Sequence, residues 1–88
     1  MSTELVHVGF GNIVAANKVV ALVSPGSAPT KRMTQAAKGK GLLIDLTSGR
    51  RNKAVLVMDS GHIVLVAIAP ETIAGRVTAG RVESREDE

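Results

Sequence analysis

The chain has no cysteine, tryptophan or tyrosine, and Phe10 is its single aromatic residue. Without cysteine, disulfides and thiolate metal sites are excluded, and the absence fits a reducing cytosol. With one aromatic ring, the chain lacks the stacking platforms on which proteins bind single-stranded bases. The many Val, Ile, Leu and Ala residues indicate a compact aliphatic core, in which we expect Phe10 to be buried.

No apolar run approaches the roughly 20 residues that a membrane-spanning helix needs. The first residues also lack the basic region and apolar segment of a signal peptide. At 88 residues, the chain is near the lower size limit for a domain that folds without cross-links. We therefore expect a soluble cytoplasmic protein with no membrane partner.

Positive charge is concentrated in the first 53 residues. This segment has eight Lys and Arg residues but only two acids, Glu4 and Asp45, although the net charge of the whole chain is +3. Residues 82–88 contain four acids and one arginine, which is typical of a disordered acidic tail. Residues 1–81 are then the single folded domain. Such a basic domain attracts polyanions such as nucleic acids or anionic lipids.

Apolar runs separated by turn signals predict an α+β fold. The strand-like runs are residues 5–8, 18–23, 42–47, 54–59 and 62–69, of which the last three are expected to form an antiparallel meander. Ser27 is a suitable N-cap for a helix with Pro29 in its first turn, and Gly39 and Gly41 end that helix. We thus predict a small antiparallel sheet of about five strands, one central helix and a short C-terminal helix at Pro70–Val77.

Two of the strand-like runs, Ala54–Met58 and Ile63–Ile68, are continuously apolar. A strand with one face in solvent alternates polar and apolar residues, so both faces of these strands should be covered. One helix and a short C-terminal element are scarcely enough to cover both faces of a sheet. We therefore expect a second subunit to supply the cover.

The titratable residues form no catalytic or metal-binding pattern. His7 and His62 lie in or beside strands, where a structural or exposed histidine is common. Asp45 is expected to pair with a cation, and would join Asp59 in a carboxylate pair only if the strands brought the two together. Gly9-Phe10-Gly11-Asn12 lacks the further residues of a dinucleotide fingerprint or a P-loop. We expect no enzyme, no cofactor, no metal and no small-molecule substrate.

Residues 47–53 predict a tight turn between two apolar strands, and this turn carries Arg50, Arg51 and Lys53. Arginine on a turn can make paired, planar contacts to phosphate or to guanine edges. The favoured partner is a polyanion. The alternative interpretation is a solvated hairpin tip that only keeps a small protein in solution.

Several separate segments together resemble the bacterial RemA family, regulators of extracellular-matrix genes. The resemblance covers about residues 5–77 without gaps. It rests on Gly9-Phe10-Gly11-Asn12-Ile13-Val14-Ala15-Ala16-Asn17, Ser24-Pro25, Ser27-Ala28-Pro29, Lys31-Arg32, Leu43-Ile44-Asp45, Gly49-Arg50-Arg51, Val57-Met58-Asp59-Ser60 and Pro70-Glu71-Thr72.

The resemblance implies a small transcriptional regulator of biofilm-matrix genes that binds double-stranded DNA. It further implies a ring-shaped homo-oligomer, with eight subunits as one candidate number, and association with the nucleoid. Arg50 and Arg51 would be the central DNA contacts. Lys18, Arg32 and Lys53 match other basic positions of the family, although Lys18 stands where arginine is common and so lacks its bidentate geometry.

Two other classes of function share parts of this pattern. A general nucleoid-like or RNA-binding oligomer would have the same basic surface without a gene-specific role. A protein-interaction module with an acidic partner would show no salt-dependent binding to DNA.

Overall fold

The computed structural model describes residues 4–80, with side chains described to Val77. The predicted acidic tail, residues 82–88, and the domain boundary at residue 81 lie outside this range. The elements are β1 (Leu5–Gly9), β2 (Asn12–Ala15), the 3-10 helix η1 (Ala16–Lys18), β3 (Val19–Val23), α1 (Ala28–Gly39), β4 (Leu43–Asp45), β5 (Ala54–Met58), β6 (Ile63–Val66) and α2 (Pro70–Gly80). The α+β class, the central helix and the C-terminal helix are confirmed.

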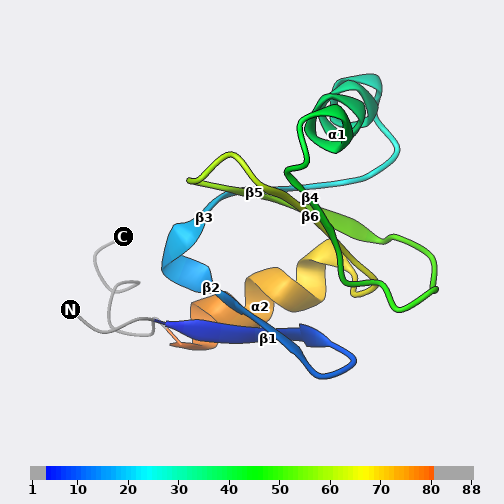
Figure 1. Cartoon of the computed structure of the whole chain (residues 1–88). Coiled ribbons are helices and arrows are strands. Elements are labelled where there is room, and N and C mark those ends of the chain that lie inside the picture. Colours follow the sequence, from blue (N-terminus) through cyan, green and yellow to red (C-terminus); the bar gives the residue numbers. More distant parts are fainter. Residues whose placement is uncertain (1–3, 81–88) are drawn as a thin grey trace.

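The six strands form two sheets instead of one. β1 and β2 are an antiparallel hairpin, and the other four strands have the order β3-β5-β6-β4. Figure 1 shows α1 on one side of the four-stranded sheet, with α2 and the β1–β2 hairpin on the other. Sequence reasoning missed β2 as a strand because it is only four residues long and begins at a turn-forming asparagine.

The predicted meander is wrong in one connection. β5 and β6 form the expected antiparallel hairpin, but β4 pairs with β6 in parallel, from Leu43 opposite Ile63 to Asp45 opposite Leu65. Two reversals of direction make β4 and β6 parallel whichever strand lies between them. β6 takes the inner position, and β4 becomes an edge strand.

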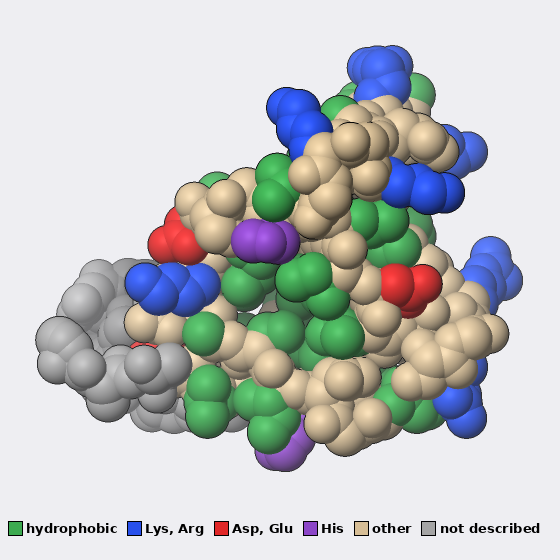
Figure 2. Space-filling view, in the orientation of Figure 1, with side chains coloured by type: hydrophobic (Ala, Val, Ile, Leu, Met, Phe, Trp, Pro, Cys, Tyr) green, Lys and Arg blue, Asp and Glu red, His purple; other side chains and the backbone are tan. Residues whose placement is uncertain are grey.

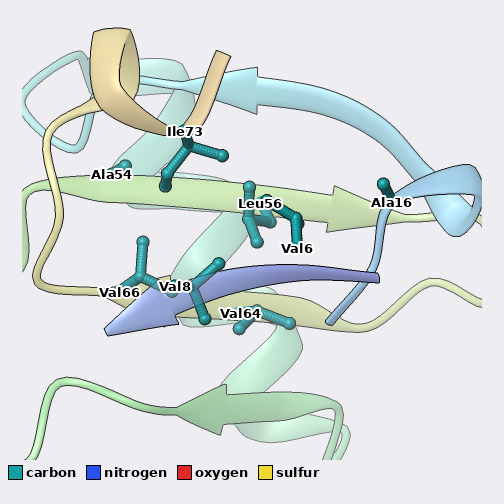
Figure 3. Close-up of a cluster of buried hydrophobic side chains, with 8 residues drawn as sticks. All are labelled: Val6, Val8, Ala16, Ala54, Leu56, Val64, Val66 and Ile73. Carbon is teal, nitrogen blue, oxygen red and sulfur yellow. The ribbon is translucent and has the colours of Figure 1, made fainter. Parts of the chain in front are cut away.

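The apolar composition of β5 and β6 is explained within the chain. On one face, a buried cluster joins β1, η1, β5, β6 and α2 (Figure 3). It consists of Val6, Val8, Ala16, Ala54, Leu56, Val64, Val66 and Ile73. On the other face, Val55 and Ile63 pack with Ala37 of α1. These two strands therefore do not require a second subunit to cover them, because the β1–β2 hairpin supplies the layer that the sequence argument lacked.

The ends of α1 follow the predicted signals. Ser27 is the N-cap, and its hydroxyl oxygen accepts a hydrogen bond from the backbone N–H of Thr30 at 3.2 Å. Pro29 lies in the first turn, where its missing N–H leaves no bond unmade. At the other end, Gly41 has a φ of 75°, and the N–H of Leu42 reaches back to the carbonyl of Ala37 at 2.9 Å. This is a glycine-dependent helix stop.

Candidate nucleic-acid interface

Residues 46–53, here called the arginine loop, connect β4 to β5 and pass the carboxyl end of β6. The loop is held at both ends by β6, because the N–H of Leu46 bonds the carbonyl of Leu65 and the N–H of Lys53 bonds that of Val66, each at 2.8 Å. The predicted tight turn between two paired strands is therefore wrong in one respect, because β4 and β5 are not neighbours in the sheet. A segment fixed by a buried strand at both ends can hold its side chains in a defined place.

The middle of the arginine loop turns sharply. Ser48 and Gly49 have φ values of 55° and 80°, and the N–H of Arg50 bonds the carbonyl of Thr47 at 3.0 Å. Positive φ is strained for a residue with a Cβ but free for glycine. Gly49 thus allows the chain to direct the following arginines outward.

Asp45 stabilises the start of the loop. Its Oδ1 accepts hydrogen bonds from the backbone N–H of Thr47 at 2.9 Å and from the Thr47 hydroxyl at 2.6 Å. These bonds, the hydroxyl bond first, hold the pKa of the Asp45 carboxyl below its ordinary value of 3.8. The expected ion pair with a cation is wrong, since the partner of Asp45 is the buried Thr47.

The three cations of the loop are open to solvent. Arg50, Arg51 and Lys53 are all exposed, and within the described residues none of them forms an ion pair. Figure 2 shows cationic side chains at the edge of the molecule where the arginine loop lies in Figure 1. Their charges and hydrogen-bond donors are available to an anionic partner.

Phe10 contacts this site, and sequence reasoning placed it wrongly. Its side chain is not in the core but 47% exposed, and the guanidinium carbon of Arg50 lies 4.0 Å from the centre of its ring. The reason is the tight turn between β1 and β2, where Phe10 has a φ of 56°. The signal in the sequence was an aromatic residue between two glycines, which is a turn pattern and not a core pattern.

The other two predicted site residues lie elsewhere. Lys18 ends η1, beside the carboxyl end of β5, whereas the arginine loop enters the amino end of that strand. Its Nζ is 4.0 Å from Asp59, and both side chains are more than half exposed. Arg32 is an exposed residue of α1. The structure therefore brings together Arg50, Arg51 and Lys53 in one loop, but not Lys18 or Arg32 with them.

Within the part of the chain that the structure describes, the histidines and the remaining acids form no second site. His7 is exposed, and the Nδ1 of His62 lies 2.7 Å from the hydroxyl of Ser60. Asp45 ends β4, and Asp59 directly follows β5. These two strands run in opposite directions, because β4 is parallel to β6 and β5 is antiparallel to it. The two acids therefore lie at opposite ends of the sheet and form no carboxylate pair. Over residues 4–80, no cluster of three potential metal ligands occurs.

Two apolar hollows border opposite edges of the four-stranded sheet. The β4 groove, about 550 Å³, is lined by residues that include Ile13, Ile44 and Met58. The β3 groove, about 310 Å³, is lined by residues that include Val20 and Val77. Figure 2 shows apolar side chains gathered in the hollow between the α1 side and the β1–β2 hairpin.

Apolar side chains that line these two grooves are open to solvent. Val20 on edge strand β3 is 66% exposed, Ile13 is 49% exposed, and Ile44 on edge strand β4 is 40% exposed. Apolar side chains that gather at a sheet edge commonly mark an interface.

No helix within residues 4–80 has both the length and the apolar composition needed to cross a membrane.

Comparison with known proteins identifies relatives along nearly the whole chain. The family model described as extracellular matrix regulatory protein A-like, or RemA-like, matches residues 5–77. Extracellular matrix regulatory protein A of Bacillus subtilis is 55% identical over 78 residues, which are 89% of this chain and 88% of that protein. A relative from Dehalococcoides mccartyi, named for a regulatory role, is 59% identical over 81 residues, 92% of this chain and 84% of its own length. The predicted resemblance is confirmed.

Proposed function

Since the chain belongs to the RemA-like family of extracellular matrix regulatory proteins, we propose that it regulates genes by binding duplex DNA through the arginine loop. The regulatory role follows from the family and its named members, which also favours a non-enzymatic protein. The proposal has three further parts: the protein binds DNA, it controls extracellular-matrix genes, and it is located in the cytoplasm at the nucleoid.

The observation that carries the proposal is the arrangement of Arg50 and Arg51. Both are exposed on a loop whose ends are fixed by β6, and no acid of the described residues neutralises them. Arginine suits this role because its planar guanidinium makes bidentate contacts with phosphate and with guanine. Lys53 adds a third charge, and Lys18 and Arg32 would contact phosphates farther along the DNA.

We further propose that subunits assemble into a ring. The β3 groove and the β4 groove are different surfaces at opposite edges of one sheet. When two different surfaces join, the contact is head-to-tail, and repeating it gives a closed ring where the rotation between subunits closes, or a filament where it does not. A ring would repeat the arginine loop around an axis, so that many weak phosphate contacts act together.

The test is DNA affinity as a function of salt. Wild-type protein should bind promoter-length duplex DNA with a steep salt dependence, since the slope of log K against log salt is about −0.9 for each phosphate neutralised. Arg50→Ala/Arg51→Ala should abolish most binding at physiological salt, because each lost contact costs about 1–3 kcal/mol at a base edge and less at a phosphate.

The matched control is Lys38→Ala/Lys40→Ala, which removes the same charge from the end of α1. If this control weakens binding as much as the arginine variant, net charge and not the arginine loop determines affinity. Equal competition by duplex RNA would instead favour the general nucleic-acid-binding alternative.

A further inference from the structure

Phe10 occupies a backbone position that is unfavourable for its side chain. The β1–β2 hairpin has a two-residue loop, Phe10-Gly11, with φ values of 56° and 80°. Turns with positive φ at both loop residues favour Asn, Asp or Gly at the first position. A bulky aromatic residue at positive φ is an outlier, and such strain is retained most often at functional sites. The turn itself therefore gives no reason for a phenyl ring here.

The neighbouring contacts fix the position of this turn. The side-chain amide of Asn12 donates to the carbonyl of Gly9 at 3.0 Å and to the carbonyl of Leu46, at the start of the arginine loop, at 3.3 Å. Gly9 lies so close to Ile68 that a Cβ at residue 9 would come within 2.8 Å of the Ile68 side chain. The hairpin turn and the arginine loop are thus held against each other.

The Phe10 ring supports the Arg50 guanidinium without neutralising its charge or occupying its N–H donors. The guanidinium lies over the ring face at 4.0 Å, which is the geometry of a cation–π contact. An acidic partner would neutralise the charge and occupy the N–H groups of the fork. A ring face does neither. The N–H donors of a guanidinium lie in its plane and point outward, so an aromatic ring stacked on that plane leaves them free.

We propose that Phe10 is a positioning residue for DNA binding, whose ring holds the Arg50 guanidinium in place with its charge and its donors free for the phosphate or base it contacts. This inference rests on the proposed function of the arginine loop. It assigns the single aromatic residue of the chain to the interface and explains why the ring stands exposed on a strained turn. Arg51 and Lys53 have no such support among the described residues.

The first measurement needs no DNA. In the NMR spectrum of the wild-type protein, the side-chain Hε of Arg50 should be shifted upfield by the ring current of Phe10. Phe10→Leu should return this signal to the position of a solvent-exposed arginine, and Phe10→Tyr should keep it shifted. An Arg50 signal that is the same in wild type and Phe10→Leu would overturn the proposal.

The second measurement is DNA affinity. Phe10→Leu should weaken binding ~2- to 5-fold, which is the equivalent of one exposed cation–π contact. The salt slope should be unchanged, because no charge is lost. Phe10→Tyr should bind like wild type. In the Arg50→Ala background, Phe10→Leu should cause no further loss. An equal loss in that background would show that the ring contacts DNA by itself, and would contradict a positioning role.

Two more variants separate this role from a structural one. Phe10→Asn suits the turn, so its melting temperature should equal or exceed that of the wild type while its DNA affinity falls. Leu5→Ala removes an exposed apolar side chain at the far end of the hairpin and should leave affinity unchanged. Wild-type protein that does not bind DNA would refute the proposed function, whereas wild-type affinity in Phe10→Leu and Phe10→Asn would refute only the positioning role.

Discussion

Asp45 is an exposed acid whose carboxylate determines the shape of the arginine loop. Its Oδ1 accepts two hydrogen bonds from the buried Thr47, which are stronger to the ionised carboxylate and so lower the pKa of Asp45. A depressed pKa in the folded state contributes stability above the unfolded pKa and loses it as pH falls through the folded value. The contribution of Asp45 should therefore be complete at neutral pH, begin to fall below about pH 4, near the unfolded pKa, and be lost as the pH passes through the lower folded pKa.

We predict that Asp45→Ala lowers the free energy of unfolding by about 1 kcal/mol at pH 7, because the buried Thr47 groups lose a charged acceptor. The difference from wild type should shrink as the pH falls below about 4. Urea unfolding at a series of pH values measures this. A difference that stays constant between pH 7 and pH 2.5 would contradict the role given to the carboxylate.

The positions of individual side chains were only partly predictable. Arg50, Arg51 and Lys53 were expected on an exposed turn, and their exposure is confirmed, since unpaired Lys and Arg side chains are almost never fully buried. Phe10 was expected in the core, since large apolar side chains usually lie there. The backbone of the two-residue turn overrode that preference, and no composition argument contains this information.

The sharp turn of the arginine loop depends on the backbone conformation of Gly49. It has a φ of 80°, and a Cβ added to it would meet no atom within 4 Å. Gly49→Ala should therefore lower stability by about 1–2 kcal/mol through strain and not through a clash. DNA affinity should fall as well, because the strain shifts the adjacent Arg50.

Gly26→Ala is the matched control for this prediction. Gly26 also has open space around its Cβ position, but its φ is not in the left-handed region. Alanine there should leave stability unchanged or raise it by about 0.4–1 kcal/mol, since it restricts the unfolded chain. Thermal unfolding of both variants, with DNA titration alongside, separates strain from simple loss of glycine. Equal effects of the two substitutions would refute the argument.

The elements themselves were largely predictable, but their pairing was not. Ser27, Pro29 and Gly41 are local signals, and they placed both ends of α1. The order of the strands depends instead on contacts distant in sequence, such as Leu43 beside Ile63. The continuous apolar pattern of β5 and β6 correctly indicated burial on two faces, yet it could not show that the β1–β2 hairpin supplies one of the covers.

The proposed assembly would give the small subunit a larger surface for DNA. A single subunit offers three cations on the arginine loop, which is a modest surface for a polyanion. If subunits join through the β3 groove and the β4 groove, the wild-type chain should form an oligomer larger than a dimer. Light scattering at micromolar concentration would measure it, and a monodisperse monomer of 9.1 kDa would contradict the ring.

The nature of the contact can be tested with two charged substitutions. Val20→Glu places a carboxylate on the β3 side, and Ile44→Glu places one on the β4 side; both side chains are already exposed in the subunit, so each variant should remain folded. Each should lose assembly, because burying an unpaired charge in an apolar contact is strongly unfavourable. Mixed together, the two variants should form a heterodimer, since one retains an intact β4 groove and the other an intact β3 groove.

This mixing experiment distinguishes head-to-tail assembly from a two-fold contact. An isologous interface uses the same surface on both subunits, so one of the two substitutions would leave assembly intact and mixing would restore nothing. The heterodimer should also bind DNA with a smaller salt slope than the wild-type oligomer, because fewer arginine loops reach the same duplex. A wild-type slope in the heterodimer would mean that no more than two arginine loops make all the phosphate contacts, and the larger ring would then add nothing to DNA binding.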